Sequence, residues 1–109
     1  MTNPTQGVDD VVHQRHRLGI LTVSAETDQV EFSYLKEVLE LTPGNLNRHL
    51  AVLEDAGYVV VKKGFIGRKQ KTWVQITRSG RTALAQEIST LEGLVQRLRL
   101  NGNGASKPS

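Results

Sequence analysis

The chain has 109 residues and a formal net charge of +3, and 38% of its residues are hydrophobic and 23% charged. These values are typical of one globular domain and exclude both a disordered chain and a membrane-spanning one, since no apolar run approaches roughly 18 residues. The first ten residues lack the pattern of a signal peptide and cysteine is absent, so we expect a cytoplasmic protein without membrane contact, disulfides or thiolate metal sites.

The N-terminal part of the chain predicts a flexible arm followed by a helix. Residues 1–8 are polar and small and form the expected arm, which precedes a single domain over residues 9–100. Asp9 is a capping-type residue, and the apolar positions after it predict one helix that ends near Ser24. The polar stretch 26–29 predicts a turn, and residues 30–32 predict a short extended segment.

Two helices separated by a short turn are expected next. Ser33 is the expected cap of a helix over 33–40, with Leu35, Val38 and Leu39 on its apolar face. A second helix is predicted over 42–57 by its end signals. Thr42 can cap the first turn, Pro43 suits the first helical position, and Gly57 offers a left-handed stop. This order is typical of a helix-turn-helix.

The helix at 42–57 has one apolar stripe and one polar face. Leu46, Leu50 and Leu53 recur at helical spacing. The opposite side is small, polar and led by a guanidinium; it contains Gly44, Asn47, Arg48, Ala51 and Asp55, with Asn45 and Val52 flanking. Such a face can approach base edges in a major groove, where Arg pairs with guanine and Asn with adenine. The alternative is an ordinary amphipathic surface helix, because end signals mark any helix.

A basic hairpin is predicted after Gly57. Residues 58–65 and 71–77 are rich in β-branched and aromatic residues, and the segment between them supplies a glycine and two cations. No acidic residue occurs between Asp55 and Glu87, whereas seven cations do: Lys62, Lys63, Arg68, Lys69, Lys71, Arg78 and Arg81. This one-sided block favours contact with a polyanion over a merely solvated surface, and the hairpin tip favours a phosphate or minor-groove contact.

The last helix is predicted over 78–100, with Thr77 as its cap and residues 101–109 as a flexible tail. Its apolar residues step by four and three, as in a heptad seam, and they are Leu84, Ile88, Leu91, Val95 and Leu98. Such a stripe more often packs on its own domain, but its length favours a symmetric dimer built on this helix, with the first helix contributing.

Four segments carry a resemblance to a known family, and they are VHQRHRLGIL (12–21), EFSYL (31–35), LTPGNLNRHLAVLEDAGYV (41–59) and KGFIGRKQKTWVQIT (63–77). They resemble the small winged-helix transcriptional regulators related to the MarR and ArsR groups, over roughly residues 9–98. The fold implied is mainly α with a small β-hairpin (α+β), a winged helix-turn-helix with a long C-terminal dimerisation helix. Arg15 and His16 depart from the pair usual in this branch, and the sequence identifies no small-molecule effector.

The resemblance implies a homodimer that binds double-stranded DNA. It places Gly44, Asn45, Asn47, Arg48 and His49 at the DNA-facing start of the recognition helix, and residues 68–71, including Gln70, in the wing. His49 could equally be a partly buried packing residue. Chemistry adds Ser33 and Thr42 as phosphate contacts and Lys63 to the basic surface. The dimer interface is expected at Val11, Val12, Leu84, Ile88, Leu91, Val95 and Leu98.

Other chemistries are less consistent with the sequence. Asp9, His13 and His16 have a spacing that could hold a divalent metal on one helix face, but solvated histidines are the favoured interpretation, and we expect no metal or other cofactor. No catalytic grouping stands out, so an enzyme is not expected. The function predicted is sequence-specific DNA binding by a homodimeric regulator, expected to be a repressor with a palindromic operator. The alternatives are a nonspecific architectural DNA-binding protein and a protein-interaction module.

Overall fold

The computed structural model describes residues 9–106. The expected arm at residues 1–8 lies outside the described part of the chain, as do the last three residues of the expected tail. The elements, in chain order, are α1 (Asp10–His13), α2 (Arg15–Ala25), β1 (Val30–Glu31), α3 (Phe32–Val38), α4 (Pro43–Asp55), β2 (Val59–Ile66), β3 (Lys69–Ile76) and α5 (Arg78–Ser106).

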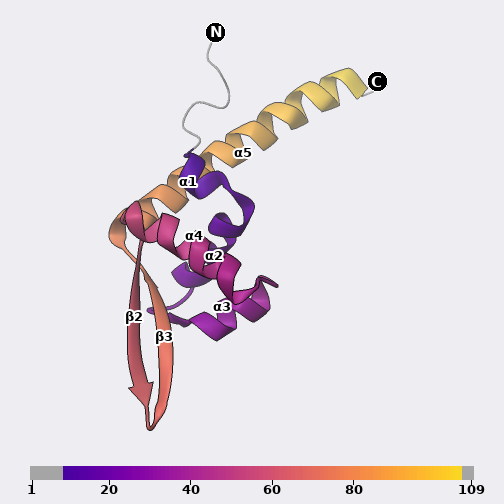
Figure 1. Ribbon diagram of the computed structural model, residues 1–109. Coiled ribbons are helices and arrows are strands. Elements are labelled where there is room, and N and C mark those ends of the chain that lie inside the picture. The colour runs from indigo at the N-terminus through magenta and orange to yellow at the C-terminus, as the bar shows by residue number, and fades with distance from the viewer. Residues whose placement is uncertain (1–8, 107–109) are drawn as a thin grey trace.

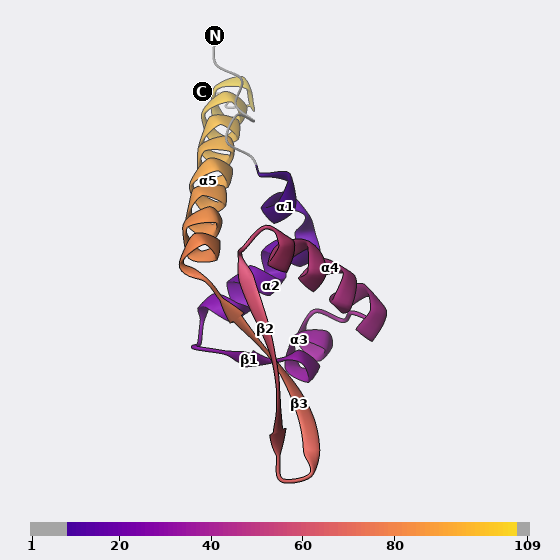
Figure 2. The same cartoon turned by 60° about the vertical axis from the view of Figure 1, so that its left-hand side comes forward.

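The expected fold class is confirmed. The chain is mostly helical, with a small antiparallel sheet in the order β1-β3-β2. In both Figure 1 and Figure 2, α5 runs away from the other helices, and the hairpin of β2 and β3 projects from the opposite end of the molecule. The molecule therefore has a helical body from which α5 projects at one end and the β2–β3 hairpin at the other.

The single helix expected from Asp9 to Ser24 is wrong, because Gln14 interrupts it. Asp9 does cap α1, accepting a hydrogen bond from the Val11 N–H at 2.9 Å. Gln14 then has extended backbone angles, and its side-chain oxygen accepts from the N–H groups of His16 and Arg17 at 2.8 and 3.0 Å. A new N-cap inside the segment satisfies the first amides of α2, so the backbone can turn there.

The expected cap at Ser33 is also wrong. α3 begins at Phe32 with Glu31 as its N-cap and without a side-chain capping bond. Glu31 is still paired with Trp73 in the sheet, so the helix starts directly where the strand ends. Of the three residues expected on the apolar face, Leu35 is buried and Leu39 is partly buried, but Val38, the last residue of the helix, is 48% exposed.

The helix predicted over 42–57 is confirmed as α4. Thr42 is its N-cap, with the hydroxyl oxygen 3.1 Å from the Asn45 N–H that donates to it, and Pro43 occupies the first turn. The helix ends at Asp55, and Gly57, two residues later, has the left-handed φ of 80° that was expected for the stop. The leucine stripe of α4 is buried against the rest of the core, which fixes which face of this helix remains outside.

The predicted hairpin is confirmed, with β2 and β3 paired from Val59·Ile76 to Ile66·Lys69. Two residues, Gly67 and Arg68, make the turn. Gly67 has a φ of 63°, as a type II′ turn requires at its first central position, and this turn matches the twist of the strands.

The expected cap of the last helix is confirmed, because the Gly80 N–H donates to the Thr77 hydroxyl at 3.0 Å. The helix itself is longer than expected, continuing to Ser106 instead of ending at Leu100. No proline occurs between Thr77 and Pro108, so the sequence offers no strong stop at 100. No helix in residues 9–106 is long and apolar enough to cross a membrane.

Candidate nucleic-acid interface

The outward face of α4 is the centre of the candidate interface. Leu46, Leu50 and Leu53 are at most 3% exposed, so they fix the rotation of the helix. The expected residues on the other side, Gly44, Asn45, Asn47 and Arg48, are all exposed. The structure therefore presents two amides and a guanidinium on one accessible helix face, as the spacing predicted.

His49 is turned away from this face. Its Nδ1 lies 3.4 Å from a terminal nitrogen of Arg17, and its ring centroid is 5.4 Å from that of His16. Burial holds the pKa of His49 below its usual 6.5, and the positive charges of Arg17, His16 and Arg48 lower it further. Of the two interpretations of His49, this geometry matches the packing residue, which joins α4 to α2.

The start of α3 and the strand β3 share a shallow groove. It is lined by Glu31, Phe32, Ser33, Gln70, Lys71 and Thr72. Ser33 and Gln70 are exposed, and the Ser33 hydroxyl is free of the capping role expected for it. Polar side chains of the helix-turn-helix and of the hairpin are thus brought to one surface.

Lys71 has an acidic partner, although the sequence predicted that no cation of this block would have one. Its Nζ lies 2.7 Å from a carboxylate oxygen of Glu31, and both side chains are about one-third exposed. The sequence between Asp55 and Glu87 contains no acidic residue, but β1 brings one alongside β3. Part of the charge of Lys71 is therefore already compensated within the protein.

The remaining cations of the hairpin are exposed. Lys63 lies on β2, Arg68 lies in the turn, and Lys69 begins β3. Together with the exposed Gln70, they form the tip and sides of the ribbon that projects from the body in Figure 2. This part of the expected wing has the accessibility that phosphate contacts need.

The residues expected at a dimer interface fall into two groups. Val12 is fully buried and Leu84 is 7% exposed, and both belong to the protomer's own core, so the expectation that they face a partner is wrong for this conformation. Further along α5, Ile88, Val95 and Leu98 are 43%, 46% and 70% exposed. An open groove on this part of α5 is lined by Ile88, Leu91, Glu92, Val95, Gln96 and Arg99. Val11 is partly buried against the core.

Asp9, His13 and His16, whose spacing could have held a metal, make other contacts. Asp9 caps α1 and also accepts a hydrogen bond from the Tyr58 hydroxyl at 2.7 Å. His13 faces Glu87, and His16 faces His49. Within residues 9–106 no three acidic, histidine or cysteine side chains form a group that could hold a metal ion.

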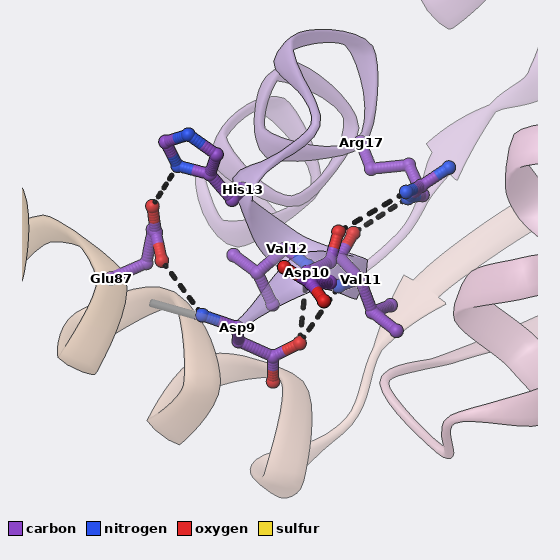
Figure 3. Close-up of polar contacts among 7 residues, drawn as sticks. All are labelled: Asp9, Asp10, Val11, Val12, His13, Arg17 and Glu87. Carbon is purple, nitrogen blue, oxygen red and sulfur yellow. Dashed lines mark hydrogen bonds and ion pairs between the residues drawn. The ribbon is translucent and has the colours of Figure 1, made fainter. Parts of the chain in front are cut away.

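Sequence reasoning missed a polar cluster that holds α1 in place (Figure 3). Glu87 of α5 contacts His13, and Arg17 of α2 donates to the carbonyl oxygens of Val11 and Asp10 at 2.6 and 3.2 Å. One signal was available, because Glu87 lies three residues after Leu84 on the side of α5 that packs inward. A carboxylate at such a position needs a polar partner.

The sequence also matches a known family and a known relative. The family described as "Winged helix DNA-binding domain" matches residues 16–95. An uncharacterized protein of Methanocaldococcus jannaschii is 44% identical over 72 residues, which are 66% of this chain and 78% of the relative.

Solved structures share the fold as well. A transcriptional regulator homologue from Pyrococcus horikoshii has a TM-score of 0.75 at 34% identity, covering 81% of this chain and 87% of its own. The transcriptional repressor CouR, solved bound to a 23-mer DNA duplex, has a TM-score of 0.72 at 17% identity. The match covers 94% of this chain and 73% of the CouR chain. A MarR-family transcriptional regulator from Rhodococcus sp. RHA1 also shares the fold, with a TM-score of 0.66 at 14% identity. The family match over residues 16–95 confirms the winged-helix resemblance drawn from the sequence. The chain belongs to the winged helix DNA-binding domain family.

Proposed function

We propose that the protein is a homodimeric, sequence-specific transcriptional regulator that acts in the cytoplasm as a repressor on a palindromic DNA operator. The observation that carries the proposal is the outward face of α4. There Asn45, Asn47 and Arg48 are exposed while the leucine stripe behind them is fixed in the core. A helix held in this way can enter a major groove without rearranging the domain.

Phosphate contacts surround this helix in the proposal. Ser33 and Thr42 are exposed at the starts of α3 and α4, and Arg68 and Lys69 are exposed at the wing. Hydroxyls at helix starts and long cations suit backbone oxygens, which position the protein without reading sequence. Lys71 has a smaller part than the sequence suggested, because Glu31 partly neutralises it.

The dimer in this proposal is built on the outer part of α5. Ile88, Leu91, Val95 and Leu98 lie beyond the protomer core and expose apolar surface along a helix that leaves the body. A second copy can cover this surface in a symmetric contact. Two recognition helices would then address half-sites about one helical turn, ~34 to 36 Å, apart.

The test of readout compares Arg48→Ala with the parent on a duplex selected from a random pool. We expect a loss of ~1 to 3 kcal/mol on the selected duplex and a much smaller loss on random DNA. Arg97→Ala, which removes an exposed guanidinium on α5, is the matched control. Equal losses on both duplexes would instead support the alternative of a nonspecific architectural protein. The observation that favours this alternative is the sequence between Asp55 and Glu87, which contains seven cations and no acidic residue.

The test of assembly is Leu91→Asp, with Ser89→Asp as a control on another face of α5. A carboxylate in the apolar contact should convert dimer to monomer and reduce affinity for a two-half-site duplex by orders of magnitude. Light scattering and binding to duplexes with one, two or mis-spaced half-sites give the result. A folded Leu91→Asp protein that stays dimeric would show that the stripe serves only its own protomer.

The repressor role has its own test. A reporter placed downstream of the selected duplex should be expressed less when the parent protein is present and regain expression with Arg48→Ala. An increase of expression with the parent would make the protein an activator.

A further inference from the structure

The outer part of the wing stands free of the third strand. β1 pairs with β3 only at Val74 and Trp73. The last four pairs of the hairpin, from Lys63·Thr72 to Ile66·Lys69, therefore continue as a two-stranded ribbon. At about 3.4 Å per residue this ribbon extends ~13 Å beyond the sheet, which exceeds the ~7.5 Å depth of a DNA minor groove.

This ribbon carries exposed apolar side chains near its tip. Phe65 is 72% exposed and Ile66 is 58% exposed. Neither residue belongs to the core cluster or to the hydrophobic residues packed against it. The domain's fold therefore does not account for a phenylalanine at this position through burial.

The two apolar residues lie on different faces of the ribbon. Side chains alternate along a strand, so Phe65 shares a face with Val59 and Val61, which pack against the helices. Ile66 lies on the other face, with Lys69 as its cross-strand partner. Strand twist turns the faces gradually but does not exchange them. Phe65 therefore continues the face of β2 that begins with Val59 and Val61.

The surroundings of Phe65 indicate a polyanion as the partner. Lys63, Arg68 and Lys69 are exposed within four residues of it, and the sequence from 56 to 86 has no acidic residue. An aromatic ring surrounded by cations suits a DNA groove, where phosphates line the rims and apolar sugar and base surfaces lie inside.

We propose that Phe65 is an apolar wedge that enters the DNA minor groove beside the major groove occupied by α4, and partly unstacks one base step there. Arg68 and Lys69 hold the flanking phosphates. The favoured step is a flexible pyrimidine–purine step, such as TA or CA, because it unstacks at the lowest energy. The wing thus adds sequence preference through DNA deformability. This inference rests on the proposed DNA binding by α4.

The experiment compares Phe65→Ala with Ile66→Ala on the selected duplex. Both changes remove an exposed apolar side chain from adjacent positions and leave net charge unchanged. We expect Phe65→Ala to weaken binding about tenfold with an unchanged salt dependence, whereas Ile66→Ala binds within about twofold of the parent. Arg68→Ala should weaken binding and reduce the salt slope by about one unit.

A second readout uses the parent protein alone. Duplexes carry 2-aminopurine at successive positions flanking the half-site, and unstacking should raise its fluorescence at one step, which Phe65→Ala should abolish. Equal affinity of Phe65→Ala and the parent, equal losses for Phe65→Ala and Ile66→Ala, or unchanged fluorescence at every position of the parent complex would each overturn the wedge.

The outcomes separate this inference from the proposed function. If the parent binds a selected duplex and loses affinity on Arg48→Ala, readout by α4 stands whatever Phe65 does. If the parent binds no selected duplex, both proposals are overturned. Thermal unfolding of each variant accompanies the binding data.

Discussion

The Nδ1 atom of His13 lies 2.8 Å from the Oε2 atom of Glu87, so the first helix is attached to the last across 74 residues of sequence. The other carboxylate oxygen of Glu87 is 3.4 Å from the N–H of Asp9, and the Glu87 side chain is fully buried. A four-residue helix is not stable by itself. We infer that α1 keeps its position through these polar contacts, through burial of Val12 and through Arg17 (Figure 3).

Glu87→Ala should destabilise the protein. It removes the partner of the partly buried Asp9 N–H and of the His13 imidazole, and because His13 is 53% exposed and can bond to water instead, we expect a cost of about 1 kcal/mol in the free energy of unfolding. Glu87→Gln retains an acceptor oxygen and should lose less. Gln86→Ala, at the exposed neighbouring position, should change stability by at most about 0.5 kcal/mol. Urea unfolding measures all three, and equal stability of Glu87→Ala and Gln86→Ala would contradict the role of this contact.

Tyr58→Phe should remove a pH dependence at the alkaline end. The hydrogen bond from Tyr58 to Asp9 raises the pKa of the phenol above its usual 10.0, and burial and the Asp9 charge act in the same direction. The folded state then holds the proton more tightly, so this stabilisation is complete below pH 10 and is lost as the pH rises through the folded pKa. The parent should lose more stability above pH 10 than Tyr58→Phe does, as measured by urea unfolding. Parallel losses in the two proteins would show that the hydrogen bond does not form in solution.

His49 should make the protein less stable in mild acid. Because its folded pKa is lowered below 6.5, the unfolded chain binds the proton more readily, and stability that is present above pH 6.5 is lost as the pH falls through the folded pKa. His49→Gln should show a smaller loss between neutral pH and pH 5. An NMR titration that gives His49 a pKa at or above 6.5 would refute this assignment.

Two glycines of α5 should respond in opposite ways to alanine. A Cβ at Gly80 would collide with the backbone carbonyl oxygen of Tyr58, whereas a Cβ at Gly93 would meet open space. Gly80→Ala should force the start of α5 away from β2 and lower the melting temperature. Gly93→Ala should stabilise the helix by about 0.5 to 1 kcal/mol, since alanine is the better helix former. If the two variants melt alike, the close approach of α5 to β2 is absent in solution.

Local signals in the sequence were sufficient for the elements whose ends and faces are defined by neighbouring residues. Thr42 and Pro43 begin α4 and Gly57 follows its end, its leucine stripe sets its rotation, and the exposure of Asn45, Asn47 and Arg48 follows from that rotation. The hairpin and the start of α5 were predictable for the same reason.

Contacts between distant segments explain what could not be predicted. Gln14 was expected inside a helix, where glutamine is favourable. It is instead the N-cap of α2, because the chain turns there and α1 packs against α5. The pairing of Lys71 with Glu31 depends on the register of β1. His49 was left with two interpretations because its contact with Arg17 and His16 is made across two helices.

The two-residue length of β1 divides the sheet into zones of unequal local stability. Near Val59 and Val74 the amides belong to a sheet packed on the core, whereas the four outer pairs have no third strand paired to them, and a two-stranded ribbon adds little stability of its own in water. Backbone amides of the outer pairs should therefore exchange with solvent faster than those of the inner pairs. Binding a duplex would then have to order this ribbon, so substitutions that stiffen the outer hairpin should slow dissociation without adding a contact to DNA.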